Sequence, residues 1–206
     1  MNKKTWRKRF AERSDLTTNL VHLTKSNGSK SSVDVVLQIL ESKRLKGSNT
    51  KSGFIIGKKP AVCFQDTPIY SLSQNIYYEQ KLRESNSNGK VRYVGSGLLF
   101  KKLDIYRKGG RPVIYDKSIE AKKYLPSSEY WRIVNFDLKN DAKIIDWTHE
   151  REWRVPIEYE FELKDTVVLM PNFKAQKDFT NKFEKQFGCN PMKKLKGIID
   201  IGQIFY

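Results

Sequence analysis

The sequence is poor in the residues that staple small extracellular proteins or hold metals. Its 206 residues include two cysteines, Cys63 and Cys189, and two histidines, His22 and His149. Two cysteines give neither a disulfide framework nor a zinc-binding spacing. No hydrophobic run approaches the roughly 20 residues of a transmembrane helix, and the basic N-terminus lacks the apolar core of a signal peptide. We therefore expect a cytoplasmic protein with reduced thiols, no metal and no membrane segment.

Acidic residues are scarce relative to basic ones. Asp and Glu total 23 against 39 Lys and Arg, which gives a formal net charge of +16. An excess of this size produces a positive field that attracts polyanions. The partner that this field attracts is either a nucleic acid or an acidic protein.

The motifs of several common enzymes are also missing. No glycine-rich loop is followed by Lys-Ser or Lys-Thr, as in a P-loop, and no Gly-x-Ser-x-Gly elbow occurs. The His149-Glu150 pair lacks the second histidine of a zinc-protease helix. Asp66, Glu158 and Glu160 offer carboxylates for Mg²⁺, at a spacing that is generic. A metal-dependent nuclease stays open as an alternative.

The order of helix and strand patterns favours one α+β domain over residues 19–206, preceded by a basic arm over residues 1–18. The sequence predicts strands over 19–24, 61–65, 91–100, 160–169 and 197–204, helices over 32–44, 69–82, 117–124 and 173–187, and a turn over 86–90. Ser31 or Ser32 is suited to cap the helix that begins near residue 32. Glycines at 95 and 97 indicate a bulge or a close approach of two backbones.

The apolar positions predict which side chains face the core. The helix over 32–44 is expected to bury Val33, Val36, Leu37 and Leu40, and the helix over 69–82 to bury Leu72, Ile76 and Tyr77. Aromatic side chains are expected mostly in the core: Phe64, Tyr70, Tyr77, Tyr78, Tyr106, Tyr115, Tyr130 and Trp131. A few of them are alternatively available to stack on nicotinamide or on unstacked bases.

The first strand carries two polar side chains on one face. His22 and Thr24 are two residues apart, and Leu23 between them takes the opposite face. An imidazole beside a hydroxyl can hydrogen-bond a ribose or an amide. The alternative is a buried histidine whose ring bonds a backbone carbonyl.

The second motif is HEREWRV at 149–155, in which residues 152–155 are predicted to begin a strand. If the whole segment is extended, Glu150 and Glu152 share one face, about 7 Å apart. Two carboxylates so close repel each other and resist burial, so they serve a site or face water. The alternative is a charged edge strand in which they pair with Arg154 or nearby lysines.

These segments resemble two families. The VHLT segment at 21–24 and the helix that ends at 39–45 resemble the start of the DarT-type toxins, which ADP-ribosylate DNA. The VCFQDTPI segment at 62–69 and the HEREWRVP segment at 149–156 are similar to the AbiGi abortive-infection proteins of phage defence. The resemblance implies an ADP-ribosyltransferase-like split β-sheet flanked by helices, with NAD⁺ as substrate.

The resemblance also implies roles for particular residues. Glu152 is the catalytic glutamate and Glu150 orients the acceptor. His22 bonds the NAD ribose and Thr24 helps to hold the dinucleotide. The residues further assigned to the cofactor are Phe64, Gln65, Tyr77 and Lys51. A loop over 47–59 would cover NAD, and a carboxylate at the ribose 2′-hydroxyl would stabilise the positive charge that develops on the sugar.

The leading hypothesis is a mono-ADP-ribosyltransferase toxin of phage defence that modifies single-stranded RNA or DNA. Such a toxin implies an antitoxin or chaperone, which the basic charge suggests is acidic. A Glu-x-Glu pair is also typical of arginine-modifying transferases, so a protein acceptor stays open. A non-catalytic nucleic-acid-binding or antitoxin-like module is the alternative from another class.

Overall fold

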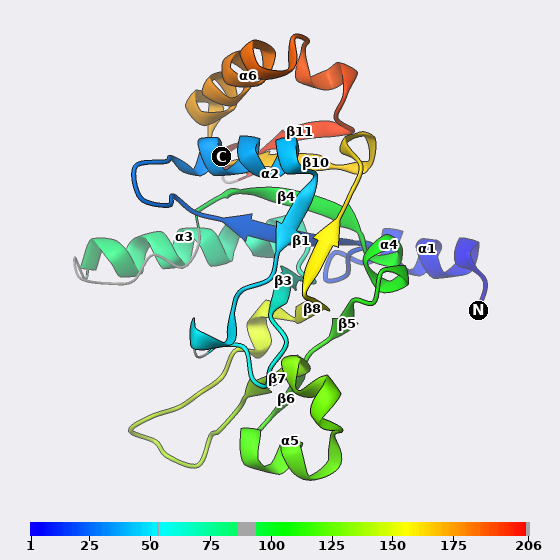
Figure 1. Ribbon diagram of the computed structural model, residues 1–206, viewed down its shortest axis with the longest axis vertical. Helices are drawn as coiled ribbons and strands as arrows, with labels where there is room; N and C mark the ends of the chain where they lie inside the picture. Colours follow the sequence, from blue (N-terminus) through cyan, green and yellow to red (C-terminus); the bar gives the residue numbers. More distant parts are fainter. Residues whose placement is uncertain (53, 86–93, 205–206) are drawn as a thin grey trace. The chain divides into compact units, whose positions relative to one another are not determined.

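The computed structural model describes residues 1–52, 54–85 and 94–204 (Figure 1). The chain divides into two compact units, each built from several segments. Unit 1 comprises Met1–Arg44, Thr67–Lys101 and Phe161–Tyr206, and unit 2 comprises Leu45–Asp66 and Lys102–Glu160. Helices and strands alternate irregularly along the chain, which confirms the predicted mixed class. Among the described residues, no helix has the length and apolar composition needed to cross a membrane.

Unit 1 is built on a mixed sheet. Its strands stand in the order β11-β10-β4-β1, with bounds β1 (Asn19–Thr24), β4 (Ser96–Lys101), β10 (Val167–Met170) and β11 (Gly197–Asp200). β4 pairs antiparallel with both β1 and β10, whereas β10 and β11 are parallel and are joined through helix α6 (Phe173–Phe187). Gly97 is needed in β4 because a Cβ there would collide with the His22 carbonyl oxygen of β1, so the predicted close approach is confirmed.

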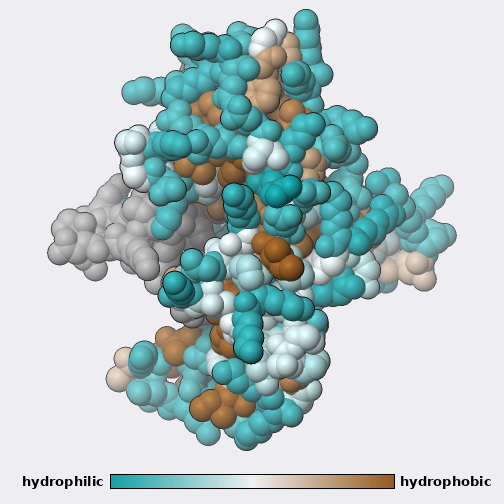
Figure 2. Space-filling view, viewed as in Figure 1, coloured by the Kyte–Doolittle hydropathy of each residue, from teal (hydrophilic) through white to brown (hydrophobic). Residues whose placement is uncertain are grey.

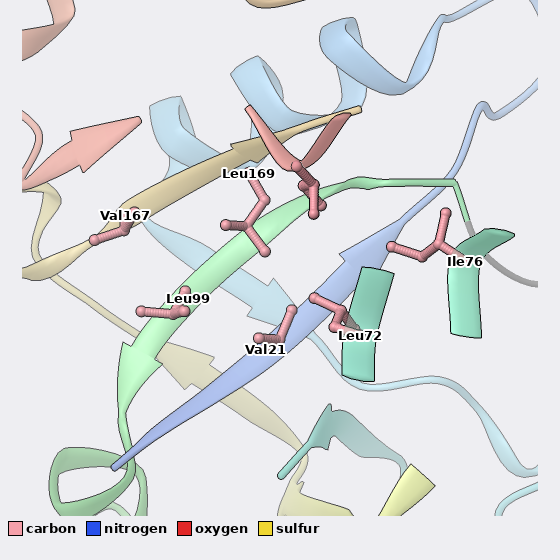
Figure 3. Packing of buried hydrophobic residues seen from close by; sticks show 7 residues of the cluster. Val21, Leu72, Ile76, Leu99, Val167 and Leu169 are labelled. Atoms are coloured by element: carbon pink, nitrogen blue, oxygen red, sulfur yellow. The ribbon is translucent and has the colours of Figure 1, made fainter. Parts of the chain in front are cut away.

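Helices cover both faces of this sheet. On one face, α2 (Ser32–Ser42) lies against β1 and β4 and contacts α6, as Figure 1 shows. On the other face, α3 (Ile69–Ser85) contributes Leu72 and Ile76 to an apolar cluster. Figure 3 shows these side chains meeting Val21, Leu99 and others from the strands. The N-terminal helix α1 (Lys3–Ala11) has no buried residue.

The start of α2 shows how local sequence sets a helix boundary. Ser31 caps the helix: its side chain accepts a hydrogen bond from the Asp34 N–H, and the Asp34 carboxylate accepts one from the Ser31 N–H. This reciprocal arrangement satisfies two backbone donors that a helix start leaves free. The predicted burial of Val33, Val36, Leu37 and Leu40 is confirmed.

The strands of unit 2 form three groups of hydrogen-bonded neighbours, two of which are separate two-stranded sheets. Strands β3 (Ala61–Gln65) and β5 (Arg111–Pro112) flank β8 (Glu152–Pro156), both antiparallel. β6 (Ile114–Asp116) pairs parallel with β7 (Ile133–Asn135), and β2 (Arg44–Lys46) pairs with β9 (Glu158–Glu160). The helices of this unit are α4 (Lys102–Arg107) and α5 (Ser118–Tyr124).

Short 3-10 turns separate these elements. They are η1 (Thr50–Ser52), η2 (Ser127–Arg132), η3 (Thr148–Glu150), η4 (Leu163–Asp165), η5 (Pro191–Lys193) and η6 (Ile201–Ile204). Two of them correct predicted strands. The strand predicted over 160–169 is wrong, because η4 interrupts it and β10 begins only at Val167. The strand predicted over 197–204 ends at Asp200, where η6 follows.

Other predictions hold or fail individually. The strands over 19–24 and 61–65 and the helix over 173–187 are confirmed to the residue. The turn predicted over 86–90 lies outside the described residues, as do residues 91–93 of the strand predicted over 91–100. The observed strand, β4, begins at Ser96. Four tyrosines expected in the core are instead exposed: Tyr70, Tyr77, Tyr78 and Tyr106.

Candidate functional site

The HEREWRV motif is not one continuous strand. Residues 148–150 form η3, and Arg151 adopts a left-handed conformation with φ 45°, so β8 begins only at Glu152. The Asp146 carboxylate explains the turn, because it accepts hydrogen bonds from both the N–H and the hydroxyl of Thr148. These bonds lower the pKa of Asp146. The expectation that Glu150 and Glu152 share one face of a strand is therefore wrong.

Glu152 forms a buried ion pair with Arg154, two residues along the same face of β8. The Arg154 Nε donates to Glu152 Oε1 at 2.8 Å, and a terminal nitrogen donates to Oε2 at 3.2 Å. The side chains are 8% and 3% exposed. Since β8 lies between β3 and β5 in unit 2, it is not the charged edge strand of the alternative interpretation, although the pairing of Glu152 with Arg154 is confirmed.

The remaining donors of Arg154 bind backbone carbonyls. One terminal nitrogen donates to the carbonyl oxygens of Trp131 at 2.7 Å and Ile133 at 3.1 Å. The other also donates to the Phe54 carbonyl at 3.2 Å. Burial is the largest influence and opposes the charged form of Arg154, but the charge and hydrogen bonds of Glu152 together with Cys63 raise the pKa of the guanidinium overall. Arg154 thereby joins β8 to two separate segments of unit 2, one containing Phe54 and the other containing Trp131 and Ile133.

Tyr115 fixes the start of β8. Its hydroxyl accepts a hydrogen bond from the Glu152 N–H at 2.8 Å. Burial, together with the Glu152 charge, raises the pKa of Tyr115 to about 12, so the phenol is neutral at physiological pH. The backbone of Glu152 makes a second hydrogen bond: its carbonyl oxygen accepts one from the N–H of Val113, the residue after β5. Glu152 is thus constrained through both its backbone and its carboxylate.

Gln65 lies directly opposite Glu152 in the β3–β8 register. Paired residues in an antiparallel sheet project on the same face, so the amide and the carboxylate neighbour each other. Gln65 is 6% exposed, and its Oε1 has no hydrogen-bond partner among the described residues. A buried acceptor without a partner is costly, and a ligand hydroxyl or N–H would satisfy it. Gln65 Oε1 is therefore a candidate acceptor for a polar ligand beside Glu152.

Cys63 occupies the same face, opposite Arg154. It packs against the cluster of Ile55, Ala61 and Trp131, which confirms the expectation that this cysteine belongs to the core. Burial, followed by the Glu152 charge, raises the pKa of the thiol. Cys63 is therefore a protonated packing group at neutral pH.

The opposite face of β3 and β8 holds a separate polar cluster. Asp66 accepts hydrogen bonds from Lys102 at 2.6 Å and from the Trp153 indole at 3.2 Å. Phe64 is fully buried and meets Tyr159 edge-on, with ring centroids 5.5 Å apart. Within the part of the chain that the structure describes, no group of three or more His, Cys, Asp or Glu side chains is arranged to hold a metal.

In unit 1, His22 and Thr24 lie on the α2 face of β1. Leu23 packs into the apolar cluster on the α3 face, which confirms the predicted alternation. Thr24 pairs in register with Ser96, whose hydroxyl hydrogen-bonds the Ser32 hydroxyl at 2.8 Å across to the start of α2. His22 and Thr24 are half-buried. The two side chains predicted to contact NAD therefore lie on the same face of β1.

Tyr77 is on the other side of that sheet. It is 46% exposed on α3, so the expectation that it points inward is wrong. Its ring lies under the Lys81 ammonium at 4.7 Å and lines a cavity of about 440 Å³ together with Pro171, Ile201 and others. Tyr77 thus belongs to a different face from His22 and Thr24. Lys51, in η1 of unit 2, is exposed.

The sequence interpretation gave no functional role to Arg154 and Tyr115. A basic residue two positions after a strand glutamate was the available signal for Arg154. Tyr115 comes from a segment 37 residues away from Glu152, and no local pattern connects them. No protein-family model matches this chain, and no curated protein or solved structure gives a match either.

Proposed function

We propose that this protein is an NAD-dependent mono-ADP-ribosyltransferase that modifies single-stranded nucleic acid, with Glu152 as the catalytic residue. The observation that carries the proposal is the constrained carboxylate at the head of β8, opposite the Gln65 amide, whose oxygen lacks a partner among the residues that the structure describes. The resemblance of the HEREWRVP and VHLT segments to ADP-ribosyltransferase toxins supports it. The net charge of +16 supports a polyanionic acceptor.

In the proposed reaction, the bond between the ribose C1′ and the nicotinamide nitrogen breaks, and the bonding pair leaves with nicotinamide. An acceptor nucleophile forms the new bond to C1′ and releases its proton to solvent water. Glu152 accepts a hydrogen bond from the ribose 2′-hydroxyl and stabilises the positive charge on the sugar. A carboxylate has about four lone-pair positions, so both bonds from Arg154 leave Glu152 able to accept another.

Arg154 has a positioning role in this proposal. Two bonds to the carboxylate fix its orientation, and three to backbone carbonyls fix the guanidinium itself. Such preorganisation avoids reorienting the carboxylate as charge develops. Gln65 Oε1 would accept a donor of the same substrate. For His22 and Thr24, which belong to unit 1, a role in holding the dinucleotide rests on the sequence resemblance alone.

The experiment is incubation with labelled NAD and, separately, single-stranded RNA, single-stranded DNA and cell-lysate protein. Label on RNA or DNA is expected, and label on protein alone would replace the nucleic-acid acceptor with the protein alternative. Intact NAD with a folded protein would contradict enzyme activity altogether. Glu120→Gln is the control variant, since Glu120 is an exposed glutamate of α5 in the same unit.

A non-catalytic module is the second candidate, and one observation favours it. Both oxygens of Glu152 already accept hydrogen bonds from Arg154, and the pair is almost wholly buried. A purely structural ion pair has the same geometry. This alternative predicts salt-sensitive binding of nucleic acid without NAD consumption, which the same incubation measures.

A further inference from the structure

Helix α6 presents two chemically different faces. Its inner face buries Phe179 and Phe183; the Phe179 ring is tilted against Phe183, and Phe183 stacks on Phe187. The opposite face carries Lys174, Lys177 and Lys185, all of them exposed. Spacings of 3, 8 and 11 residues place these lysines on one stripe of the helix, turned away from the phenylalanines.

The three stripe lysines are not neutralised by acidic neighbours. No ion pair of Lys174, Lys177 or Lys185 is found within the described part of the chain. The remaining lysine of the helix, Lys182, is instead paired with acidic side chains: it bonds the carboxylates of Asp34 and Asp178, both at 2.9 Å. The structure thus uses Lys182 to join α6 to α2 and leaves the stripe lysines in solvent.

The segment after α6 adds more lysines. Lys193, Lys194 and Lys196 are exposed in η5 and just beyond it. Residues 173–196 contain seven lysines against two acidic residues. Two apolar side chains project among these charges: Phe173 is 68% exposed and Met192 is 60% exposed. Figure 2 shows a mostly hydrophilic surface over α6 with a few hydrophobic side chains among it.

We propose that this surface, the exposed lysines of residues 174–196, binds the phosphate backbone of single-stranded nucleic acid. Lys174 and Lys185 are separated by about 16 Å along the helix, a length that faces several phosphates. Lysines on flexible stems neutralise phosphates without reading sequence. The exposed Phe173 ring offers a base a surface for stacking, which only an unpaired strand can use.

This inference deepens the proposed function, since it names the surface that would hold the acceptor strand. Backbone binding itself requires no catalysis. The two proposals therefore fail separately when binding and NAD cleavage are measured on the same preparations.

The test is fluorescence anisotropy with labelled 20-nucleotide RNA and DNA single strands over a series of salt concentrations. The variant is Lys174→Gln/Lys177→Gln/Lys185→Gln. The control is Lys122→Gln/Lys139→Gln/Lys143→Gln, which removes the same charge from exposed lysines of unit 2. Each lost phosphate contact lowers the slope of log K against log salt by ~0.7. We expect the stripe variant to lose about 2 from this slope and to bind at least tenfold more weakly at low salt.

The control variant is expected to bind within about twofold of wild type. Equal losses in both variants would show a general charge effect and overturn the assignment. Failure of wild type to bind either strand would also overturn it. If a polyglutamate peptide displaces RNA as well as unlabelled RNA of equal charge does, the surface suits an acidic protein partner and the nucleic-acid assignment falls.

NAD cleavage distinguishes the remaining outcomes. The stripe variant is expected to cleave NAD at the wild-type rate while it transfers less label to RNA. Salt-dependent binding that is lost in the stripe variant of a protein without NAD cleavage would retain the surface and remove the proposed enzyme. Duplex DNA bound as tightly as single strands would overturn the single-strand preference.

Discussion

β1 of unit 1 and β8 of unit 2 both carry polar side chains in otherwise apolar strands, but they accommodate them differently. His22 and Thr24 of β1 are half-buried on one face, and the opposite face packs an apolar cluster. β8 instead buries a full ion pair, Glu152 with Arg154. Half-buried polar groups retain contact with water, whereas a buried charge requires a dedicated set of partners. The difference indicates that β8 is the more constrained of the two sites.

The largest stability effect is expected at Arg154. Arg154→Met leaves the Glu152 carboxylate buried without its counter-charge and frees three carbonyls, so a loss of about 3–5 kcal/mol is expected. Urea unfolding measures it. Arg107→Met is the control, because the Arg107 side chain is 65% exposed in its pair with Asp104. A loss below about 1 kcal/mol at Arg154 would mean that β8 is no more constrained than β1.

Tyr115→Phe is expected to have the next largest effect. The Glu152 N–H loses its acceptor, which costs about 1–3 kcal/mol for a buried donor. Because burial raises the pKa of Tyr115 to about 12, its stabilising contribution is complete below the unfolded-state pKa near 10. That contribution falls as pH rises from about 10 to 12. The stability gap between wild type and Tyr115→Phe should therefore narrow in this range, and a constant gap would contradict the assignment.

Ser31→Ala tests a comparable device in unit 1, where the satisfied group lies at the surface. Loss of the capping hydrogen bond to the Asp34 N–H is expected to cost about 1 kcal/mol. Thermal unfolding is the measurement, and the exposed Ser29→Ala is the control. If Ser31→Ala matches that control, the capping box contributes nothing to the stability of α2.

His22→Ala should have the smallest effect on stability. The side chain is half-buried, so a loss below about 1 kcal/mol is expected. Under the proposed function, loss of one hydrogen bond to the dinucleotide raises KM for NAD by about fivefold. An unchanged KM in initial-rate kinetics would remove His22 from the proposed binding residues.

Local pattern was sufficient for the elements with strong signals. Helix 173–187 was predictable from its phenylalanine spacing, and strand 61–65 from its run of apolar residues. Prediction failed where side-chain hydrogen bonds override a strand pattern, as Asp146 does before η3. It also failed for Tyr77, whose helical spacing fits the core although the side chain is exposed.

The candidate site was predictable only in part, because some of its contacts join residues that are distant in sequence. Local patterns predicted the short strands that carry Glu152 and Gln65 in unit 2 and His22 and Thr24 in unit 1. The strand face on which each side chain lies follows from alternation. The contacts of Arg154 with Phe54, Trp131 and Ile133 come from segments distant in sequence. Tertiary structure alone brings those carbonyls to one guanidinium.

The most direct test of the account measures NAD cleavage by Glu152→Gln at a temperature where the variant is folded. Removal of one partner leaves Arg154 buried and unpaired and lowers the melting temperature of the variant. Its folded state at the assay temperature is therefore checked by circular dichroism. Glu152→Gln/Arg154→Met supplies a second preparation that leaves no unpaired charge. Cleavage at least ~100-fold slower is expected in both folded variants, with wild-type cleavage in Glu120→Gln. Wild-type cleavage by folded Glu152→Gln would contradict this prediction and reduce the pair to a structural ion pair.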